Sequence, residues 1–119
     1  MKALTVRQPW ADLIVAGVKD VENRSWRTHY RGPLVIHSAR RRPTPADVER
    51  AEAIGGPVPF IEWHDLGRII GRVTLIDCVQ DSTSPWAEAG AWHWLLDDPV
   101  STVAPDIVQG RLGLWEFDA

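Results

Sequence analysis

The sequence of 119 residues has a single cysteine, Cys78, and no apolar run that approaches the length of a membrane span. One cysteine cannot form an internal disulfide, and its position in the apolar stretch VTLIDCV is typical of a buried thiol. The first residues, MKALTVRQPWADL, lack the uninterrupted apolar core and the cleavage site of a secretory signal. We therefore expect a cytoplasmic protein that does not insert into a membrane.

Motifs that mark several common catalytic sites are also missing. The four histidines show neither the His-x-x-x-His spacing nor a cysteine partner, so we expect no bound metal. The sequence contains no Gly-x-x-x-x-Gly-Lys or Gly-x-Gly-x-x-Gly phosphate loop and no Gly-x-Ser-x-Gly nucleophile elbow. Nucleotide hydrolysis of the phosphate-loop type is thereby excluded, and no cofactor is expected.

Positive charge is concentrated in the first third of the chain. Residues 1–42 contain nine Lys or Arg and three Asp or Glu, a net charge of +6. Residues 43–119 contain four and thirteen, a net charge of -9, and the two parts sum to the -3 of the whole chain. A basic segment of this kind can attract a polyanion such as nucleic acid. The alternative is that the two signs neutralise each other across the folded surface.

Apolar and alternating patterns predict several short strands. The strand segments are residues 2–6, 32–39, 68–79, 91–98 and 110–117, with a further extended segment at 19–26. Within this set, Gly71 is expected to form a bulge or bend where the sheet curls. The proline-containing segment 57–67 is expected to be a loop that lays Phe60 and Trp63 onto the core.

Helical features appear before and after the 32–39 strand. Residues 8–17 have Pro9 at the first helical position and Gly17 at the left-handed stop. Residues 84–90, SPWAEAG, are expected to form a single helical turn with Ser84 as its cap.

A second full helix is expected at residues 44–56, with Thr44 as the N-cap and an exposed acidic face that includes Asp47. The sequence thus predicts five or six strands and two or three helices. A doubly wound sheet would need more helices than this. The pattern predicts one α+β domain, residues 1–119, built on a small curled sheet or barrel.

Lys19, Glu22 and Arg24, in the segment GVKDVENR, form the group that could carry chemistry. Lys19 follows the helix-ending Gly17, so its side chain can point into a cavity beside the turn. Glu22 and Arg24 are two residues apart on an extended chain, so they project from one face and can pair. Lys19 could contact a phosphate beside a rigid Arg24, or act as a reactive amine if burial and nearby cations favour its neutral form. The third alternative is a surface ion-pair cluster without a role.

Seven tryptophans in 119 residues are a heavy aromatic load. Trp10, Trp26 and Trp92 flank the motif or the strands expected to face it. Aromatic rings beside cations are the groups that stack a base and hold its phosphate, although most of the seven should lie in the core. The candidate nucleic-acid contacts are Arg7, Gln8, Trp10, Lys19, Arg24, Trp26, Arg27 and Arg40.

This segment and its surroundings resemble the ASCH domain family, named for activating signal cointegrator homology. GVKDVENR matches the Gly-x-Lys-x-x-Glu-x-Arg motif of that family in full, at Gly17, Lys19, Glu22 and Arg24. The similarity continues in order through LTVRQPWADLIVAG, SWRTHYRGPLVIHSA, RIIGRVTLIDCV, WHWLLDDP and GRLGLWEF. The resemblance implies a PUA-like fold, a small β-barrel with helices packed against it.

The resemblance also implies a cleft between the barrel and the first helix, lined by the motif residues and proposed to bind RNA or a nucleotide. Some relatives are similar to amidohydrolases that deacetylate acetylcytidine, and others to metal-independent ribonucleases. In the deacetylating branch the motif lysine is the proposed catalytic amine, and a later glutamate acts as acid and base. The nearest candidate for that glutamate is Glu88, but Glu22 stands where that branch has threonine.

Three functional hypotheses follow. The first is a binding module for RNA, single-stranded nucleic acid or a nucleotide. The second is a small metal-independent hydrolase of a modified nucleoside or RNA, with Lys19, Glu22 and Glu88 as the catalytic candidates. A reactive Lys19 requires Glu22 to be occupied mainly with Arg24, because a close carboxylate stabilises the ammonium form. The third is a protein-interaction module, which a large exposed apolar patch away from the cleft would favour.

Overall fold

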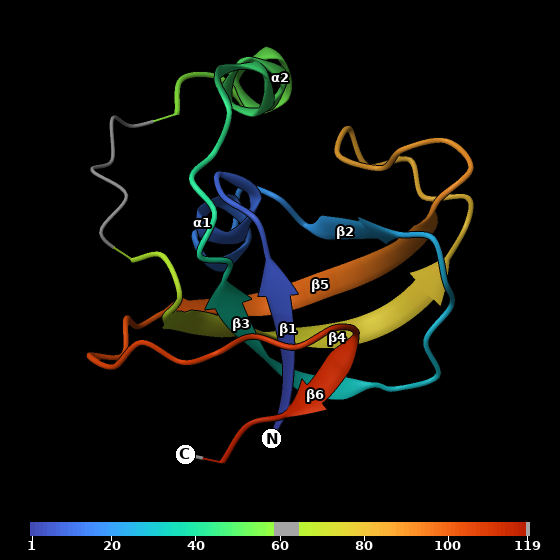
Figure 1. Ribbon diagram of the computed structural model, residues 1–119. Coiled ribbons are helices and arrows are strands. Elements are labelled where there is room, and N and C mark those ends of the chain that lie inside the picture. The colour runs from blue at the N-terminus through green and yellow to red at the C-terminus, as the bar shows by residue number, and fades with distance from the viewer. Residues whose placement is uncertain (59–64, 119) are drawn as a thin grey trace.

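A computed structural model describes residues 1–58 and 65–118, which form two helices and one curled six-stranded sheet (Figure 1). In spatial order the sheet contains β2 (Val21–Arg24), β5 (Trp92–Ser101), β4 (Ile69–Val79), β3 (Gly32–Ser38), β1 (Lys2–Val6) and β6 (Leu114–Glu116). β1 and β3 run parallel, and the other neighbouring pairs are antiparallel. The predicted α+β class with a barrel-like sheet is confirmed. The contacts expected for Phe60 and Trp63 lie outside the described residues.

The main core lies between the curled sheet and α1 (Trp10–Val15), which contacts β3, β4 and β5 (Figure 1). Its fully buried members include Leu4, Ile14, Ile70 and Trp94, and Cys78 is buried among them as the apolar pattern predicted. A six-residue helix is too short to be stable alone. The burial of these apolar side chains against the sheet therefore stabilises α1.

Gly71 is the point at which β4 can pass close to its neighbours. Its φ is +156°, and a Cβ built there would lie 2.1 Å from the carbonyl oxygen of Val100. The same Cβ would lie 2.9 Å from Val15 on α1. The β3–β4 register shifts between Ile36 and His37, opposite this glycine. The bulge predicted at Gly71 is therefore confirmed.

The turn after α1 positions the motif lysine. Pro9 is the N-cap residue rather than the first helical residue, and Gln8 Oε1 accepts a hydrogen bond from the backbone N–H of Asp12 at 2.9 Å. Gly17 has a φ of +79°, as predicted for a left-handed stop. The backbone N–H of Lys19 bonds to the carbonyl of Leu13 at 3.0 Å. The chain thus turns back beside α1 immediately before β2 begins.

α2 (Pro45–Gly55) lies beyond α1, away from the sheet (Figure 1). Thr44 caps it as predicted, because its side chain accepts a hydrogen bond from the backbone N–H of Asp47 at 3.1 Å. The exposed position predicted for Asp47 is wrong: it is buried, and Arg50 Nη2 donates to its Oδ1 at 2.7 Å. Within the described residues, no helix combines the length and apolar character required to cross a membrane.

The connection between β4 and β5 contains turns at residues 84–90 in place of the predicted helical turn. The side chain of Ser84 does accept a hydrogen bond from the N–H of Trp86, at 3.2 Å. A helix does not follow, because Asn23 on β2 takes the carbonyl of Trp86 and the N–H of Glu88. These two hydrogen bonds hold the β4–β5 connection beside the motif segment of β2, to which Asn23 belongs.

Candidate functional site

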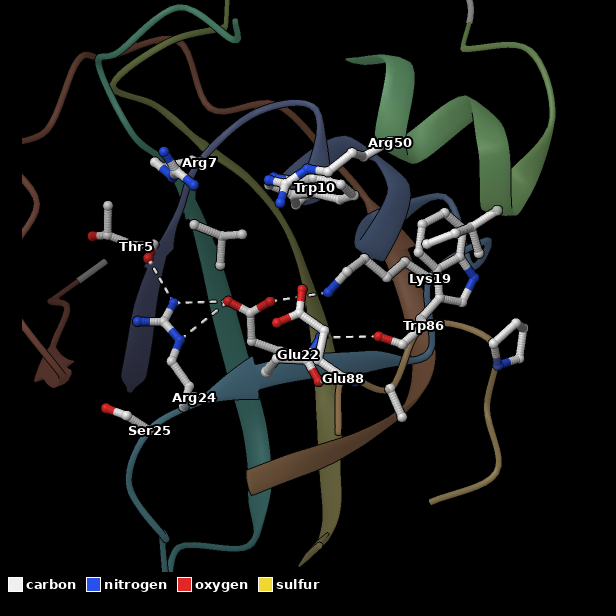
Figure 2. Close-up of a pocket in the computed structure, with 15 residues that line it drawn as sticks. Thr5, Arg7, Trp10, Lys19, Glu22, Arg24, Ser25, Arg50, Trp86 and Glu88 are labelled. Carbon is white, nitrogen blue, oxygen red and sulfur yellow. Dashed lines mark hydrogen bonds and ion pairs between the residues drawn. The ribbon is translucent and has the colours of Figure 1, made fainter. Parts of the chain in front are cut away.

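A cleft of about 640 Å³ opens between α1, α2, β2 and the β4–β5 connection (Figure 2). Arg7 from the end of β1, Trp10 and Arg50 lie along one side of it in this view, and Glu88 enters from the other. Lys19, Glu22 and Arg24 form its floor. A cleft of this volume is within the range that holds a small ligand in proteins.

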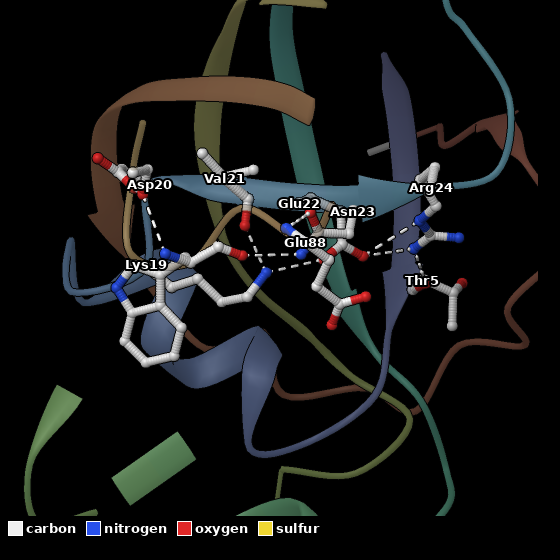
Figure 3. Close-up of polar contacts among 10 residues, drawn as sticks. Thr5, Lys19, Asp20, Val21, Glu22, Asn23, Arg24 and Glu88 are labelled. Atoms are coloured by element: carbon white, nitrogen blue, oxygen red, sulfur yellow. Dashed lines mark hydrogen bonds and ion pairs between the residues drawn. The ribbon is translucent and has the colours of Figure 1, made fainter. Parts of the chain in front are cut away.

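Glu22 links Lys19 and Arg24 on the floor of the cleft (Figure 3). Its Oε1 accepts from Lys19 Nζ at 3.0 Å, and its Oε2 accepts from Arg24 Nε at 3.1 Å and Nη2 at 2.9 Å. Lys19 Nζ also donates to the carbonyl of Val21, and Arg24 Nη2 donates to the carbonyl of Thr5 at 3.0 Å. One cation is thus fixed on each side of the carboxylate. Among the described residues no group accepts a hydrogen bond from Arg24 Nη1.

Burial and ion pairing act on Glu22 in opposite directions. Burial alone would raise the pKa of Glu22, but the Lys19 ammonium and the Arg24 guanidinium outweigh it and hold the pKa below the ordinary value. The side chains of Lys19 and Glu22 are only 4% and 10% exposed, so salt screens this pair weakly. Glu22 is therefore ionised at neutral pH and belongs to a permanent charged network.

The charges that line the cleft are mainly positive. Its lining contains four cationic side chains, from Arg7, Lys19, Arg24 and Arg50, against the two carboxylates of Glu22 and Glu88. The local sum is +2, although the whole chain carries -3. The concave shape concentrates this positive potential where an anionic ligand would enter.

Two tryptophans form an aromatic wall beside the floor. The rings of Trp10 and Trp86 meet edge to face, with centroids 6.4 Å apart and an interplanar angle of 79°. Trp86 is only 5% exposed and supports Trp10, which is half-buried and lines the cleft. The guanidinium of Arg50 lies 5.6 Å from the Trp10 ring centroid, and Lys19 Nζ lies 6.0 Å from it. Trp10 is therefore an aromatic surface within reach of two cations.

A family comparison identifies the fold that carries this cleft. The model of the ASCH domain matches residues 4–101 of the chain, which include the whole floor of the cleft. The chain belongs to the ASCH family. Activating signal cointegrator 1 from Homo sapiens is 32% identical to this ASCH chain over 134 residues, and the Mus musculus protein is 31% identical over 128. Each alignment covers 98% of this chain but 22% of the relative, so the chain spans about a fifth of the length of these relatives.

A solved structure agrees with this ASCH assignment at the level of the fold. The crystal structure of a mutant of ZmASCH from Zymomonas mobilis superposes with a TM-score of 0.62 at 17% sequence identity. The match covers 98% of this chain and 89% of ZmASCH. The curled sheet with two helices is thus an ASCH architecture, as the motif resemblance implied.

The ASCH fold brings several of the predicted site residues to one place. Both motif cations, the motif glutamate and three residues from other segments line the same cleft: Arg7, Trp10, Lys19, Glu22, Arg24 and Glu88. Lys19 was expected at a cavity beside the turn after the first helix, and its side chain lies there. The roles of these residues in binding or catalysis stay predictions.

The other predicted contacts lie outside the cleft. Gln8 is 1% exposed and holds the start of α1, so a ligand cannot reach it. Trp26 packs edge-on against Trp94, with ring centroids 4.8 Å apart. The guanidinium of Arg27 lies 5.5 Å from the Trp92 ring centroid. Arg40 is exposed and packs beside Gly67. These three exposed side chains belong to the basic segment but do not line the cleft.

Sequence reasoning missed Arg50, Trp86 and Asn23 as parts of this site. All three line the cleft. Arg50 is three residues after Asp47 on a helix, which signals an ion pair but not that the pair faces a cleft. Asn23 stands inside the motif, between Glu22 and Arg24, and its position was the available signal. Nothing in the local sequence separates Trp86 from the other tryptophans.

The structure does not show the arrangement that a reactive Lys19 requires. That arrangement needs Glu22 to be occupied mainly with Arg24, whereas Glu22 Oε1 accepts a hydrogen bond from Lys19 Nζ at 3.0 Å. The carboxylate is shared between both cations, with one oxygen on each. Lys19 Nζ is thus held in a buried ion pair with the Glu22 carboxylate. The observed geometry therefore supports Lys19 as a fixed positive charge.

The lowered pKa of Glu22 predicts how its contribution to stability depends on pH. A folded-state pKa below the unfolded value contributes stability that is present above the unfolded value and is lost as the pH falls through the folded one. The free energy of unfolding of the wild type minus that of Glu22→Gln should therefore be constant from about pH 7 to 5 and shrink below it. Urea unfolding at a series of pH values measures this difference. A difference that grows on acidification would contradict the ion-pair assignment.

Proposed function

We propose that this ASCH domain binds RNA or another single-stranded nucleic acid, and holds one nucleotide in the cleft that the Gly-x-Lys-x-x-Glu-x-Arg motif lines. Three features support this function. The floor offers cations held in place, the rim offers two more arginines, and Trp10 offers an aromatic surface. A nucleotide has the matching anionic phosphate and flat base.

The observation that carries the proposal is that the Glu22 carboxylate binds both Lys19 and Arg24. By bonding both Lys19 and Arg24 it fixes their positions before a ligand arrives. Arg24 then presents Nη1 from a guanidinium whose orientation is set by two partners, Glu22 and the carbonyl of Thr5. A preorganised guanidinium loses less conformational entropy on binding phosphate than a mobile one.

A single strand fits this cleft better than a duplex. The bases of a duplex are stacked and paired, so neither face nor edge is free to enter a pocket beside Trp10. An unpaired nucleotide can place its base in the cleft while its backbone phosphates stay near Arg7 and Arg50, which are both exposed.

The hydrolase alternative receives less support, although Lys19 and Glu88 do line the same cleft. Lys19 Nζ is engaged by the Glu22 carboxylate and by the carbonyl of Val21. A group held in this way is suited to electrostatic contact rather than to nucleophilic attack. The protein-interaction alternative stays a prediction.

Salt dependence tests the proposed function. We expect fluorescence-labelled single-stranded RNA to bind weakly, with a slope of log K against log salt of roughly -2, since single strands give about -0.7 for each phosphate contact and three arginines are available. A duplex of the same sequence should bind more weakly. Anisotropy titrations at several salt concentrations measure both quantities. Binding that does not depend on salt would refute phosphate recognition.

A further inference from the structure

Hydrogen bonds from two different strands hold the backbone around Glu88, which forms one wall of the cleft. Asn23 Oδ1 accepts from the Glu88 N–H at 2.9 Å, and Asn23 Nδ2 donates to the carbonyl of Trp86 at 2.9 Å. His93 Nδ1 accepts from the N–H of Ser82 at 3.1 Å, so its Nε2 carries the proton and donates to the Glu88 carbonyl at 2.7 Å. His93 is only 3% exposed. The connection is thus tied to β2 and β5 immediately around Glu88.

The Glu88 carboxylate differs from that of Glu22 in having no partner. Among the described residues, no side chain or backbone group forms an ion pair or hydrogen bond with it. Its residue is exposed, and Figure 2 shows the carboxylate projecting into the cleft from the side opposite Arg7 and Arg50. In a cleft whose other lining side chains carry a net positive charge, this group repels phosphate from its own wall and accepts only N–H or O–H donors.

We infer that Glu88 reads the edge of the bound base and selects guanine, an inference that rests on the proposed function of the cleft. An ionised carboxylate accepts two parallel N–H bonds, as it does from arginine. Guanine is the common base whose Watson–Crick edge offers two neighbouring donors, N1–H and the 2-amino group. Adenine and cytosine offer one amino group beside an acceptor nitrogen, and uracil offers one N–H between two carbonyl groups. An acceptor beside a carboxylate is repelled, so Glu88 discriminates against these three bases.

The remaining groups of the cleft are placed consistently with a guanine nucleotide. The Arg50 guanidinium lies over the Trp10 ring at 5.6 Å, so the base stacks on this guanidinium or takes its place on the ring. Arg7 and Arg50 lie across the cleft from Glu88, where they can hold phosphate (Figure 2). Phosphate and base edge are thereby directed to opposite sides, with repulsion from Glu88 preventing the reversed orientation.

Base selectivity is tested with single-stranded pentanucleotides that differ only at the centre: UUGUU, UUAUU, UUCUU, UUUUU and UUIUU, in which inosine lacks the 2-amino group. We expect the guanine strand to bind the wild type about tenfold or more tightly than the adenine, cytosine and uracil strands, the range for a good bidentate base contact. The inosine strand should lose most of this advantage. Guanosine monophosphate is titrated in parallel: full affinity for it indicates a free nucleotide as the ligand, and a need for the flanking uridines indicates a strand.

Two variants separate base reading from net charge. Glu88→Gln should reduce the guanine preference to about twofold or less, while affinity for UUUUU rises because one negative charge is removed. Asp81→Asn removes one exposed negative charge from the same connection, outside the cleft lining, and should leave the preference intact. Equal binding of all five strands by the wild type, or a preference that survives in Glu88→Gln, would overturn the guanine assignment alone. Failure of every strand and of the nucleotide to bind would overturn the proposed function with it.

Discussion

Replacing Glu22 with glutamine should lower the free energy of unfolding by about 3–5 kcal/mol, the loss measured when one partner is removed from a buried ion pair. Glutamine keeps the shape of the side chain and one acceptor oxygen, but it removes the counter-charge of the Lys19 ammonium. The side chain of Lys19 is only 4% exposed. Arg24 also loses the carboxylate that receives two of its three hydrogen bonds. The penalty is large because water cannot reach the uncompensated charge.

Urea unfolding of Glu116→Gln provides the matched control. Glu116 is also a strand carboxylate, and its Oε1 lies 2.7 Å from Lys2 Nζ, but its side chain is 61% exposed. Water replaces a lost surface ion pair, so this variant should differ little from the wild type. If Glu22→Gln were no less stable than Glu116→Gln, Glu22 would not be the link that holds the floor of the cleft.

Neutralising the two rim arginines, as Arg7→Gln with Arg50→Gln, should weaken binding of single-stranded RNA by at least about a hundredfold at low salt, because each charged hydrogen bond to phosphate contributes roughly 1.5–3 kcal/mol. The slope of log K against log salt should fall by about 1.4, since each lost contact with a single strand accounts for about 0.7. Anisotropy titrations at matched salt concentrations measure both changes. Circular dichroism confirms that the variant is folded, which matters because both arginines approach Asp47.

The control is Arg27→Gln with Arg40→Gln, which also removes two positive charges from the protein. Both residues belong to the +6 segment, but neither lines the cleft. If the cleft is the binding site, this pair should reduce affinity by a few-fold at most, through the general field of the protein. Equal losses for the two pairs would assign binding to the basic segment as a whole and not to the cleft.

The strands and the motif could be predicted because their signals are local. Apolar patterns identified five strands, alternation identified the extended segment that contains β2, and glycines identified the stop after α1 and the bend in β4. The pairing of Glu22 with Arg24 followed from their spacing on an extended chain. Lys19 and Arg24 fall at one cleft because the turn at Gly17 and the start of β2 adjoin in sequence.

The rest of the site depends on contacts between distant segments. Trp86 reaches the cleft because Asn23, 63 residues earlier, binds its carbonyl, and no periodicity in SPWAEAG reports that bond. The same contact explains why the predicted helical turn is absent. Asp47 was placed on an exposed face by helical periodicity, but the side chains of Arg50 and of the distant Arg7 approach its carboxylate to 2.7 and 4.0 Å. Gln8 was grouped with Arg7 by adjacency, although its side chain is buried and accepts a hydrogen bond from the N–H of Asp12 in the first turn of α1.

The most direct measurement is a titration of ¹⁵N-labelled protein with a single-stranded pentanucleotide, followed in the amide and indole N–H region of the NMR spectrum. We expect the indole signal of Trp10 and the backbone amides of Asn23 and Glu88 to shift together, since all three residues line the cleft. The indole of Trp26 and the amide of Arg40, which lie outside it, should stay unchanged. Shifts at Trp26 and Arg40 with Trp10, Asn23 and Glu88 unchanged would contradict binding in the cleft.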